Sequence, residues 1–345
     1  MNRSAELERR VSRKRNTQDS HRLNTKMVIA IRVPIVVILL VVANSLSFGQ
    51  AAGSKTSRSK STNAFLDREP PPVSAEARRD MEARLEEARE RYRANPNDAA
   101  AAIWVGRRLA YPGRFREAIA FYTHAIKKFP RDARLYRHRG HRYITTRQFA
   151  LAVEDLKTAA SLTKDKPDEL EPDGQPNARN VPTSTLQFNI WYHLGLAYYL
   201  TGDNPKALAA YRECLKVSNS PDRLVATTHW LYMTLRRLHR TRGAAKVLTP
   251  ITAQMDIVEN TGYHRLLLMY KGEVLAESLK AEAMKEVSSP GSYSILYGIG
   301  NWHLYNGRRT EAATVFRQML SGNQWTSFGY IAAEADMKRL RSAVR

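Results

Sequence analysis

The sequence predicts an all-α protein, a solenoid of stacked helix-turn-helix repeats. Three segments of the chain align with one another without gaps, and self-similarity of this kind indicates a repeat architecture. The 345 residues are 43% hydrophobic and 26% charged, which is enough apolar material for a core shared between neighbouring repeats.

The N-terminal part of the chain is first basic and then apolar. Residues 1–26 hold eight Lys or Arg against three Asp or Glu, and an apolar run of 11 residues, 33–43, follows. Small residues then permit cleavage after Gly49 or Ala51. We therefore expect residues 1–52 to be a basic N-terminus with a signal peptide, and the protein to be periplasmic or extracellular.

A membrane anchor over residues 27–48 is the alternative to a cleaved signal. A spanning helix needs about 20 apolar residues, and Arg32, Pro34 and Asn44 bound a shorter run. Translation starting at Met27 instead of Met1 would shorten the basic region.

The chain carries a large excess of positive charge. Its net charge is +22, and residues 1–51 hold nine basic and three acidic residues, so the remainder keeps +16. Such a charge attracts acidic partners and anionic membrane surfaces. Nucleic acid is an unlikely partner for an exported protein. The single cysteine excludes an internal disulfide and a cysteine-rich zinc module.

Residues 53–73 are rich in Ser, Lys and Pro, which predicts a flexible linker. The repeat domain is expected over 74–345. It begins with a helix after Ser74, in which acidic and basic residues alternate and which Pro96 ends. We expect this helix to cap the array.

The aligned segments begin at Ala99, Ala133 and Phe188. Each has small residues at its eighth and twentieth places and a large apolar residue at its twenty-fourth. These positions are Gly106, Gly140 and Gly195, then Ala118, Ala152 and Ala207, then Tyr122, Leu156 and Tyr211. Small side chains let two helices approach closely, so each segment predicts a helical hairpin that must stack on its neighbours.

This pattern resembles the tetratricopeptide repeat family. In the third segment the family's signature positions hold Trp191, Leu194, Gly195, Tyr198, Ala207 and Tyr211. The clearest repeats are 99–132, 133–166, 188–221 and 293–326, while 225–285 fits less well. The resemblance implies a right-handed solenoid whose concave face is formed by the first helix of each pair, and it implies peptide binding.

An acidic, proline-rich insert interrupts the array at 165–185, with four prolines and five acidic residues. Helix is unlikely there. A loop of this length is either a solvated surface loop or a functional element. In the second case the insert folds over the groove and lines a site.

The family's inner-face positions predict a basic and aromatic groove. Arginine offers forked donors to carboxylates, and aromatic rings offer flat apolar contact. The alternative is that the arginines are solvated and the aromatic residues belong to the core. The candidates are Trp104, Arg107, Arg134, Arg137, His138, His141, Asn189, Tyr192, His193, His229, Trp230, Arg236, Tyr297 and Asn301.

Catalytic motifs are missing from the sequence, and we expect no catalysis, cofactor or metal. His193 or His141 near Glu169 or Asp173 is the one acid–base constellation that the chain offers. His138 and His141 lack the further ligands that a metal requires. Cys214 occupies a small-residue packing position and is expected to be a buried filler.

The sequence thus predicts an exported scaffold that binds a protein or peptide with acidic or carboxylate groups. A small-molecule or catalytic site roofed by the insert, and a membrane-tethered assembly factor, are the alternatives.

Overall fold

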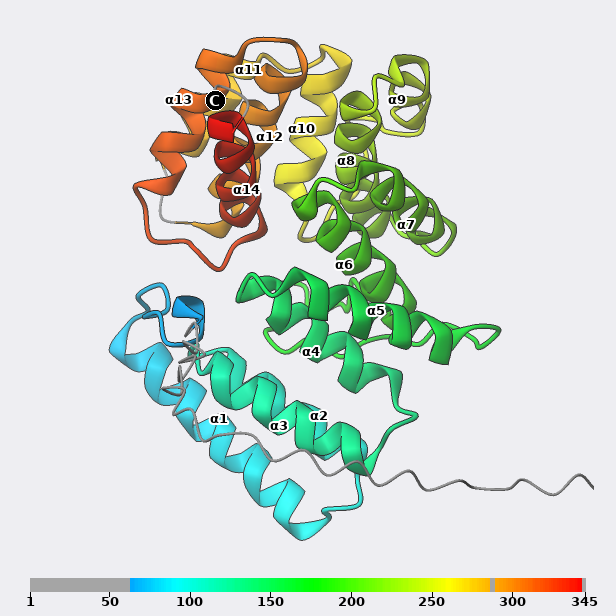
Figure 1. The fold of residues 1–345 in the computed structure, drawn as a ribbon, viewed down its shortest axis with the longest axis vertical. Helices are drawn as coiled ribbons and strands as arrows, with labels where there is room; N and C mark the ends of the chain where they lie inside the picture. Colours follow the sequence, from blue (N-terminus) through cyan, green and yellow to red (C-terminus); the bar gives the residue numbers. More distant parts are fainter. Residues whose placement is uncertain (1–62, 286–288, 343–345) are drawn as a thin grey trace, which may run out of the picture. The chain divides into compact units, whose positions relative to one another are not determined.

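The computed structural model describes residues 63–285 and 289–342, so the expected signal peptide or anchor lies outside the described residues. The described chain is helical and has no strand, which confirms the all-α class (Figure 1). In chain order its elements are η1 (Ala64–Leu66), α1 (Ala75–Ala94), α2 (Ala99–Ala110), α3 (Phe115–Lys128), α4 (Ala133–Thr145), α5 (Phe149–Thr163), α6 (Leu186–Thr201), α7 (Asn204–Lys216), α8 (Pro221–Arg237), α9 (Thr241–Val247), α10 (Thr261–Lys271), α11 (Ala276–Lys285), α12 (Pro290–Tyr305), α13 (Arg309–Leu320) and α14 (Phe328–Ser342).

Consecutive helices form the predicted hairpins, and the hairpins stack in sequence order. The glycines lie where the two helices of a pair approach most closely. A Cβ atom added at Gly195 would lie 2.6 Å from the ring of Tyr211, and one at Gly300 would lie 2.5 Å from Phe316. The small residue at the eighth place therefore makes room for the large residue at the twenty-fourth, as the sequence predicts.

Aspartates begin several of these helices. Asp98, Asp132 and Asp203 accept backbone N–H groups in the first turns of α2, α4 and α7, which satisfies donors that a helix start leaves unpaired. One continuous apolar cluster runs from Leu85 of α1 to Met337 of α14. Of the helices described, none combines the length and apolarity that crossing a membrane requires.

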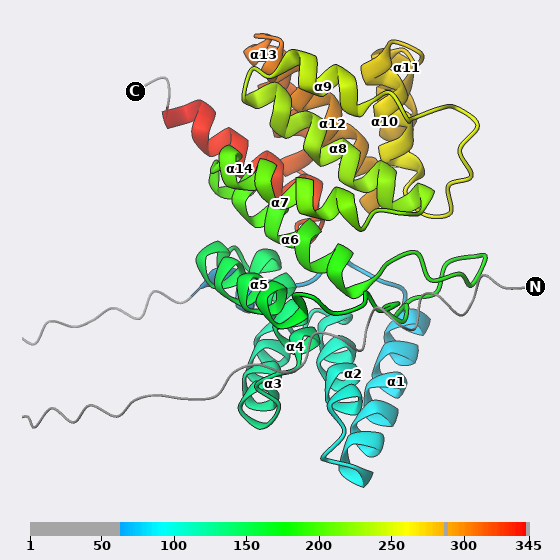
Figure 2. The same ribbon diagram turned by 90° about the vertical axis from the view of Figure 1, so that its right-hand side faces the viewer.

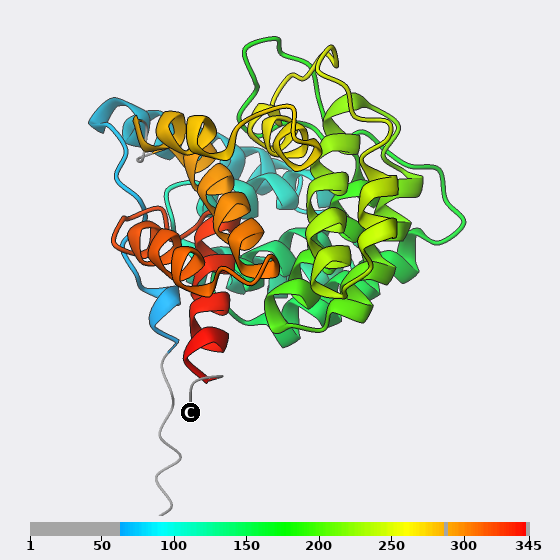
Figure 3. The same ribbon diagram turned by 90° about the horizontal axis from the view of Figure 1, so that it is seen from above.

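The last helix does more than cover the end of the array. It packs on α12 and α13, and it also contacts α6 (Figures 2 and 3). Its Asp336 is buried and forms an ion pair with Arg237 at the end of α8. Helix α14 therefore joins α6 and α8 to α12 and α13.

The described part of the expected linker packs against the array. The Asn63 side chain donates to the Thr146 carbonyl at 2.8 Å, and Trp325 Nε1 donates to the Glu69 carbonyl at 2.7 Å. The flexible linker expected over 53–73 is thus corrected for residues 63–73. The aromatic ring of Phe65 and the following prolines give this stretch surface to bury, which its Ser- and Lys-rich beginning lacks.

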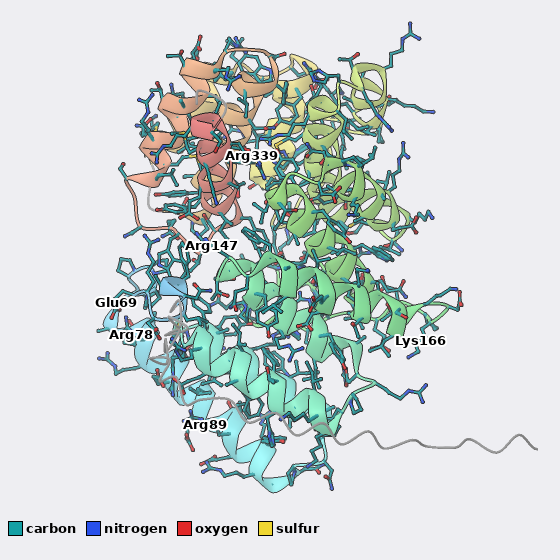
Figure 4. All side chains as sticks on the ribbon, viewed as in Figure 1. Glu69, Arg78, Arg89, Arg147, Lys166 and Arg339 are labelled. Atoms are coloured by element: carbon teal, nitrogen blue, oxygen red, sulfur yellow. The ribbon has the colours of Figure 1, made fainter. Side chains whose placement is uncertain are left out.

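Arg147, in the turn between α4 and α5, contacts both this N-terminal stretch and the segment from Trp325 to Glu334, which enters α14 (Figure 4). Its guanidinium donates to Glu334 at 2.6 Å and to the Trp325 carbonyl at 2.8 Å. It also lies 4.3 Å from the ring centroid of Phe65. One cation therefore contacts segments from both ends of the described chain.

Candidate functional site

The insert folds back onto the first helices of the first three hairpins. Backbone hydrogen bonds run from Glu171 N to the Ser184 carbonyl at 3.1 Å and from Leu186 N to the Glu169 carbonyl at 2.8 Å. These bonds close the base of the loop just before α6. Of the two interpretations of the insert, the structure supports the one in which it folds over the predicted groove.

One carboxylate of the insert is buried on that face. Glu171 Oε2 lies 2.8 Å from Arg137 Nη2, and Oε1 lies 3.1 Å from His138 Nε2. The Asn189 side chain donates to Oε2 as well. Only 6% of Glu171 is exposed. Arg137, His138 and Asn189, from α4 and α6, are called the carboxylate seat below.

The charges in this seat are matched. Burial opposes ionisation of Glu171, but the positive charge of Arg137 and the contact with His138 bring its pKa down to about 2. Burial, followed by repulsion from Arg137, lowers the pKa of His138 to about 3. His138 is thus neutral at physiological pH. Its Nδ1 lies 2.8 Å from Arg137 Nη1, so Nδ1 accepts and the hydrogen on Nε2 faces Glu171.

The insert makes a second contact nearer to α2. Its Gly174 carbonyl accepts from Arg108 Nη1 at 3.0 Å. A Cβ atom at Gly174 would lie 1.5 Å from the hydroxyl of Tyr111, so this position admits only glycine without rearrangement. Beside this contact, Arg107 and Arg108 lie 4.4 and 5.0 Å from the ring centroid of Trp104. The half-buried Trp104 is therefore covered by cations.

A histidine and phenylalanine cluster lies next along the same face. The ring centroids of His141 and His193 are 4.5 Å apart, and Phe328, the first residue of α14, lies 5.3 and 5.5 Å from them. Burial lowers the pKa of His193 to about 3 and that of His141 well below its usual value. Both rings are therefore neutral near pH 7.

Aromatic candidates farther along the array form core contacts. Trp230 Nε1 donates to the Tyr192 hydroxyl at 2.8 Å, and that hydroxyl lies 3.3 Å from the hydroxyl of Tyr263. His229 stacks on Tyr263 with a centroid distance of 4.6 Å. Burial lowers the pKa of His229 to about 3.

The remaining inner-face candidates lie under α14. Arg237 donates to Asp336 and to the Asn301 side chain. The Tyr297 hydroxyl donates to Asp336 at 2.9 Å, and Tyr199 donates to Asn301 at 3.1 Å. Asp336 therefore occupies the second half of the face in the way that Glu171 occupies the first.

The structure places most of the predicted groove residues under other parts of the chain. Five remain half-exposed, namely Trp104, Arg107, Arg134, His141 and Arg236. Nine are buried, namely Arg137, His138, Asn189, Tyr192, His193, His229, Trp230, Tyr297 and Asn301. The expectation of one continuous open groove is thus corrected, because the insert and α14 cover it.

Two half-exposed arginines are engaged locally. Arg134 pairs with Asp132, the residue that caps its own helix, at 2.5 Å. Arg236 donates to Asn306 at 2.8 Å and lies 4.3 Å from the ring centroid of Tyr305.

The one acid–base constellation that the sequence offers, His141 or His193 with Glu169 or Asp173, does not form among the described residues. The insert's buried acid is Glu171, and it meets His138. Sequence reasoning missed Glu171, Arg237 and Asp336. A signal was present for Glu171, which is an acid flanked by Leu170 and Pro172 in an otherwise solvated loop.

Two observations bear on metal-ion binding and on the reactivity of Cys214. No group of three His, Cys, Asp or Glu residues within 63–285 and 289–342 is arranged to hold a metal ion. Cys214 is buried, as expected, and burial raises its pKa to about 12. Its thiol is therefore protonated and a poor nucleophile.

The family comparison agrees with this geometry. Residues 188–220, which span α6 and α7, match the family model of the tetratricopeptide repeat. The chain carries a tetratricopeptide repeat over residues 188–220. The family resemblance of the sequence is thereby confirmed for this hairpin, and the α2–α3, α4–α5 and α12–α13 hairpins repeat its close glycine contact.

No curated protein matches the chain. Among solved structures, it is similar to YrrB, a tetratricopeptide repeat protein with an unusual peptide-binding site, at 15% identity over 74% of this chain and 99% of that one, with a TM-score of 0.39. A tetratricopeptide repeat protein from Parabacteroides merdae is 16% identical over 74% of this chain and 93% of that one, with a TM-score of 0.41.

Proposed function

We propose that this protein is a non-catalytic interaction scaffold that binds an acidic segment of a protein partner. The observation that carries the proposal is the seating of Glu171 on Arg137, His138 and Asn189. An acidic stretch of the chain itself occupies the face that such repeats present to peptides. A partner with a similarly placed carboxylate would compete for the same seat.

The chemistry of the seat favours a carboxylate over a neutral group. Arg137 is buried, and removing the one acid that faces it while the site stays closed to water would leave an uncompensated charge, at a cost of several kcal/mol. An occupant must therefore bring a negative charge or leave the seat open to water. The positive charge of the chain would raise the rate at which acidic partners arrive.

The protonation states support a role without catalysis. A general base works best when its pKa lies near the working pH, whereas His138, His193 and His229 have pKa values of about 3.

We also propose that the protein is exported. The basis is the apolar run, followed by small residues that permit cleavage after Gly49 or Ala51. Retention at a membrane through residues 27–48 would place the same scaffold at the membrane surface.

The test uses the insert as the probe. A variant lacking residues 169–180, closed by a short Gly-Ser linker, is titrated with a labelled peptide of residues 166–184, and fluorescence anisotropy reports binding. We expect the peptide to bind, and its Glu171→Gln version to bind at least about tenfold more weakly, as loss of a charged hydrogen bond predicts.

Two controls make the result specific. Arg137→Gln in the deletion variant should abolish discrimination between the two peptides. Arg139→Gln should preserve it, because Arg139 faces Asp155 at 2.7 Å and not the insert. Equal binding of both peptides to a deletion variant with intact helical circular dichroism would refute the carboxylate seat as a binding site.

A further inference from the structure

A pocket of about 440 Å³ lies beside the carboxylate seat and is separate from it. Its walls come from parts of the chain that are distant in sequence. They include Pro70 to Pro72 before α1, Tyr111 after α2, Arg142 on α4, Gln175 in the insert, Pro290 at the start of α12 and Thr326 before α14. None of the residues of the carboxylate seat lines it. The insert thus forms part of the wall of a second site.

Arg142 is the charged residue of this pocket, and its guanidinium lacks a partner. Within 63–285 and 289–342, no hydrogen bond or ion pair joins it to another residue. The ring of Phe115 lies 5.7 Å from its Cζ atom. The other arginines of α4 differ in this respect, since Arg137 and Arg139 each hold a carboxylate at 2.7 to 2.8 Å.

The electrostatic surroundings of Arg142 are unfavourable to a cation. Burial lowers its pKa to about 10, and the neighbouring charges of Arg137 and Arg107 act in the same direction. The guanidinium is still protonated at neutral pH. Arg142 is only partly exposed, on the side that lines the pocket. A charge held largely away from water without a partner is unfavourable, so we explain the arrangement by an anion that enters the pocket from outside.

We propose that this pocket binds an organic monocarboxylate whose apolar body lies against Pro70 to Pro72 and Phe115. The single unpaired guanidinium presents one fork of donors, which matches one carboxylate. A doubly charged phosphate would need a second cation, and Arg107 beside the pocket is already directed at the Tyr111 hydroxyl and the Trp104 ring. The volume lies within the range of small-molecule sites.

The carboxylate can belong to a small organic acid or to the C-terminus of a peptide, and the experiment separates them. Isothermal titration calorimetry on the full-length chain compares 4-phenylbutyrate with its amide, and N-acetyl-leucyl-phenylalanine with its amide. At least one acid should bind, and its amide should bind at least about tenfold more weakly, because the charged hydrogen bonds are lost. Tighter binding of the dipeptide acid assigns the site to a peptide terminus, and tighter binding of phenylbutyrate assigns it to a small acid.

Arg142→Gln provides the sharper test. Binding of the acid should fall at least about tenfold, while the thermal midpoint of the free protein stays the same or rises, because an unpaired and partly buried charge is removed. Arg139→Gln on the same helix is the matched control. It should lower the thermal midpoint, because it leaves Asp155 unpaired, and leave binding of the acid unchanged.

Three results would overturn the proposal. These are failure of both acids to bind, equal binding of an acid and its amide, and unchanged affinity of Arg142→Gln for the acid. None of them bears on the seat of Glu171, since the pocket and the seat use different arginines. Failure here is therefore distinguishable from failure of the proposed scaffold function.

Discussion

Two segments cover the inner face of this array, and each does so with one carboxylate. The insert places Glu171 on Arg137 of α4, and α14 places Asp336 on Arg237 of α8. The segments differ in what surrounds the carboxylate. Around Glu171 most of the insert is exposed, whereas Asp336 lies on a helix with seven buried residues.

This difference separates a removable cover from a part of the core. Opening the insert exposes few apolar side chains, so polar contacts hold it in place. They are the carboxylate seat, the bond from Arg108 to the Gly174 carbonyl, and the bonds from Asn177 and Thr183 to Glu259 and from Arg179 to Asp256. Removing α14 would expose Ile331, Ala332, Ala333 and Met337 to water. Both covers form an ion pair between an arginine and a carboxylate, but only the pair at Glu171 lies on a segment that is mostly exposed.

Acidification should produce the largest effect. The pKa values of His138, His193 and His229 are about 3 in the folded protein, against an ordinary value of 6.5. The unfolded chain therefore binds more protons as the pH falls below 6.5, and stability is lost in that direction. At pH 5 the loss is about 2 kcal/mol for each histidine.

Urea unfolding between pH 7.5 and 5 measures this loss. Hydrogen exchange at pH 7 and pH 5.5 locates it, and we expect α4 and α6 to lose protection before α12 and α14. The reason is that His138 and His141 lie on α4 and His193 lies on α6. A pH-independent free energy of unfolding would contradict the neutral buried state of these histidines.

Asp336→Asn should be the most damaging single substitution of this comparison. It leaves Arg237 buried without its carboxylate and should cost about 3–5 kcal/mol. Denaturant unfolding gives the value. A loss below about 1 kcal/mol would show that Arg237 reaches water, and α14 would then be a cover like the insert.

Glu171→Gln should cost less in global stability, about 1–2 kcal/mol, because the insert can open and let water reach Arg137. Limited proteolysis should show the larger change, with faster cleavage within 175–181 than in the wild type. If Glu171→Gln lowered the free energy of unfolding as much as Asp336→Asn does, the insert would be part of the core in the same way as α14.

Tyr297→Phe should have the smallest effect, about 1 kcal/mol. It removes one donor to Asp336 but leaves the two arginines, Arg237 and Arg339, in place. Unchanged hydrogen exchange in α4 would confirm that the two covers act independently, whereas increased exchange there would show coupling between them.

The hairpins were predictable from sequence because the contact that forms them is local. Gly195 and Tyr211 lie 16 positions apart and recur with the same spacing in other repeats. The covers were not predictable in the same way. The pairs Arg137–Glu171 and Arg237–Asp336 join residues with no shared spacing, and repeat periodicity carries no information about them.

The inner-face positions themselves were well chosen, since most of the candidates lie side by side on α4, α6, α8 and α12. The sequence did not reveal that two segments of the same chain, the insert and α14, cover these positions. Arg142 is a second residue that the sequence did not single out. It falls one position from the predicted His141, and only the absence of a described partner distinguishes it from the other arginines of α4.

The hydrogen bond from Trp325 to the Glu69 carbonyl spans 256 residues. Repeat arrays ordinarily fold through contacts between neighbours, so that repeats can be added or removed and the ends fray independently. Here the first and last described segments are tied to each other and to Arg147, and forming that tie closes a very long loop. The array should therefore fold more slowly than its local hairpins suggest, and its repeats should unfold together. A repeat could not be added or removed without breaking the contacts between the two ends.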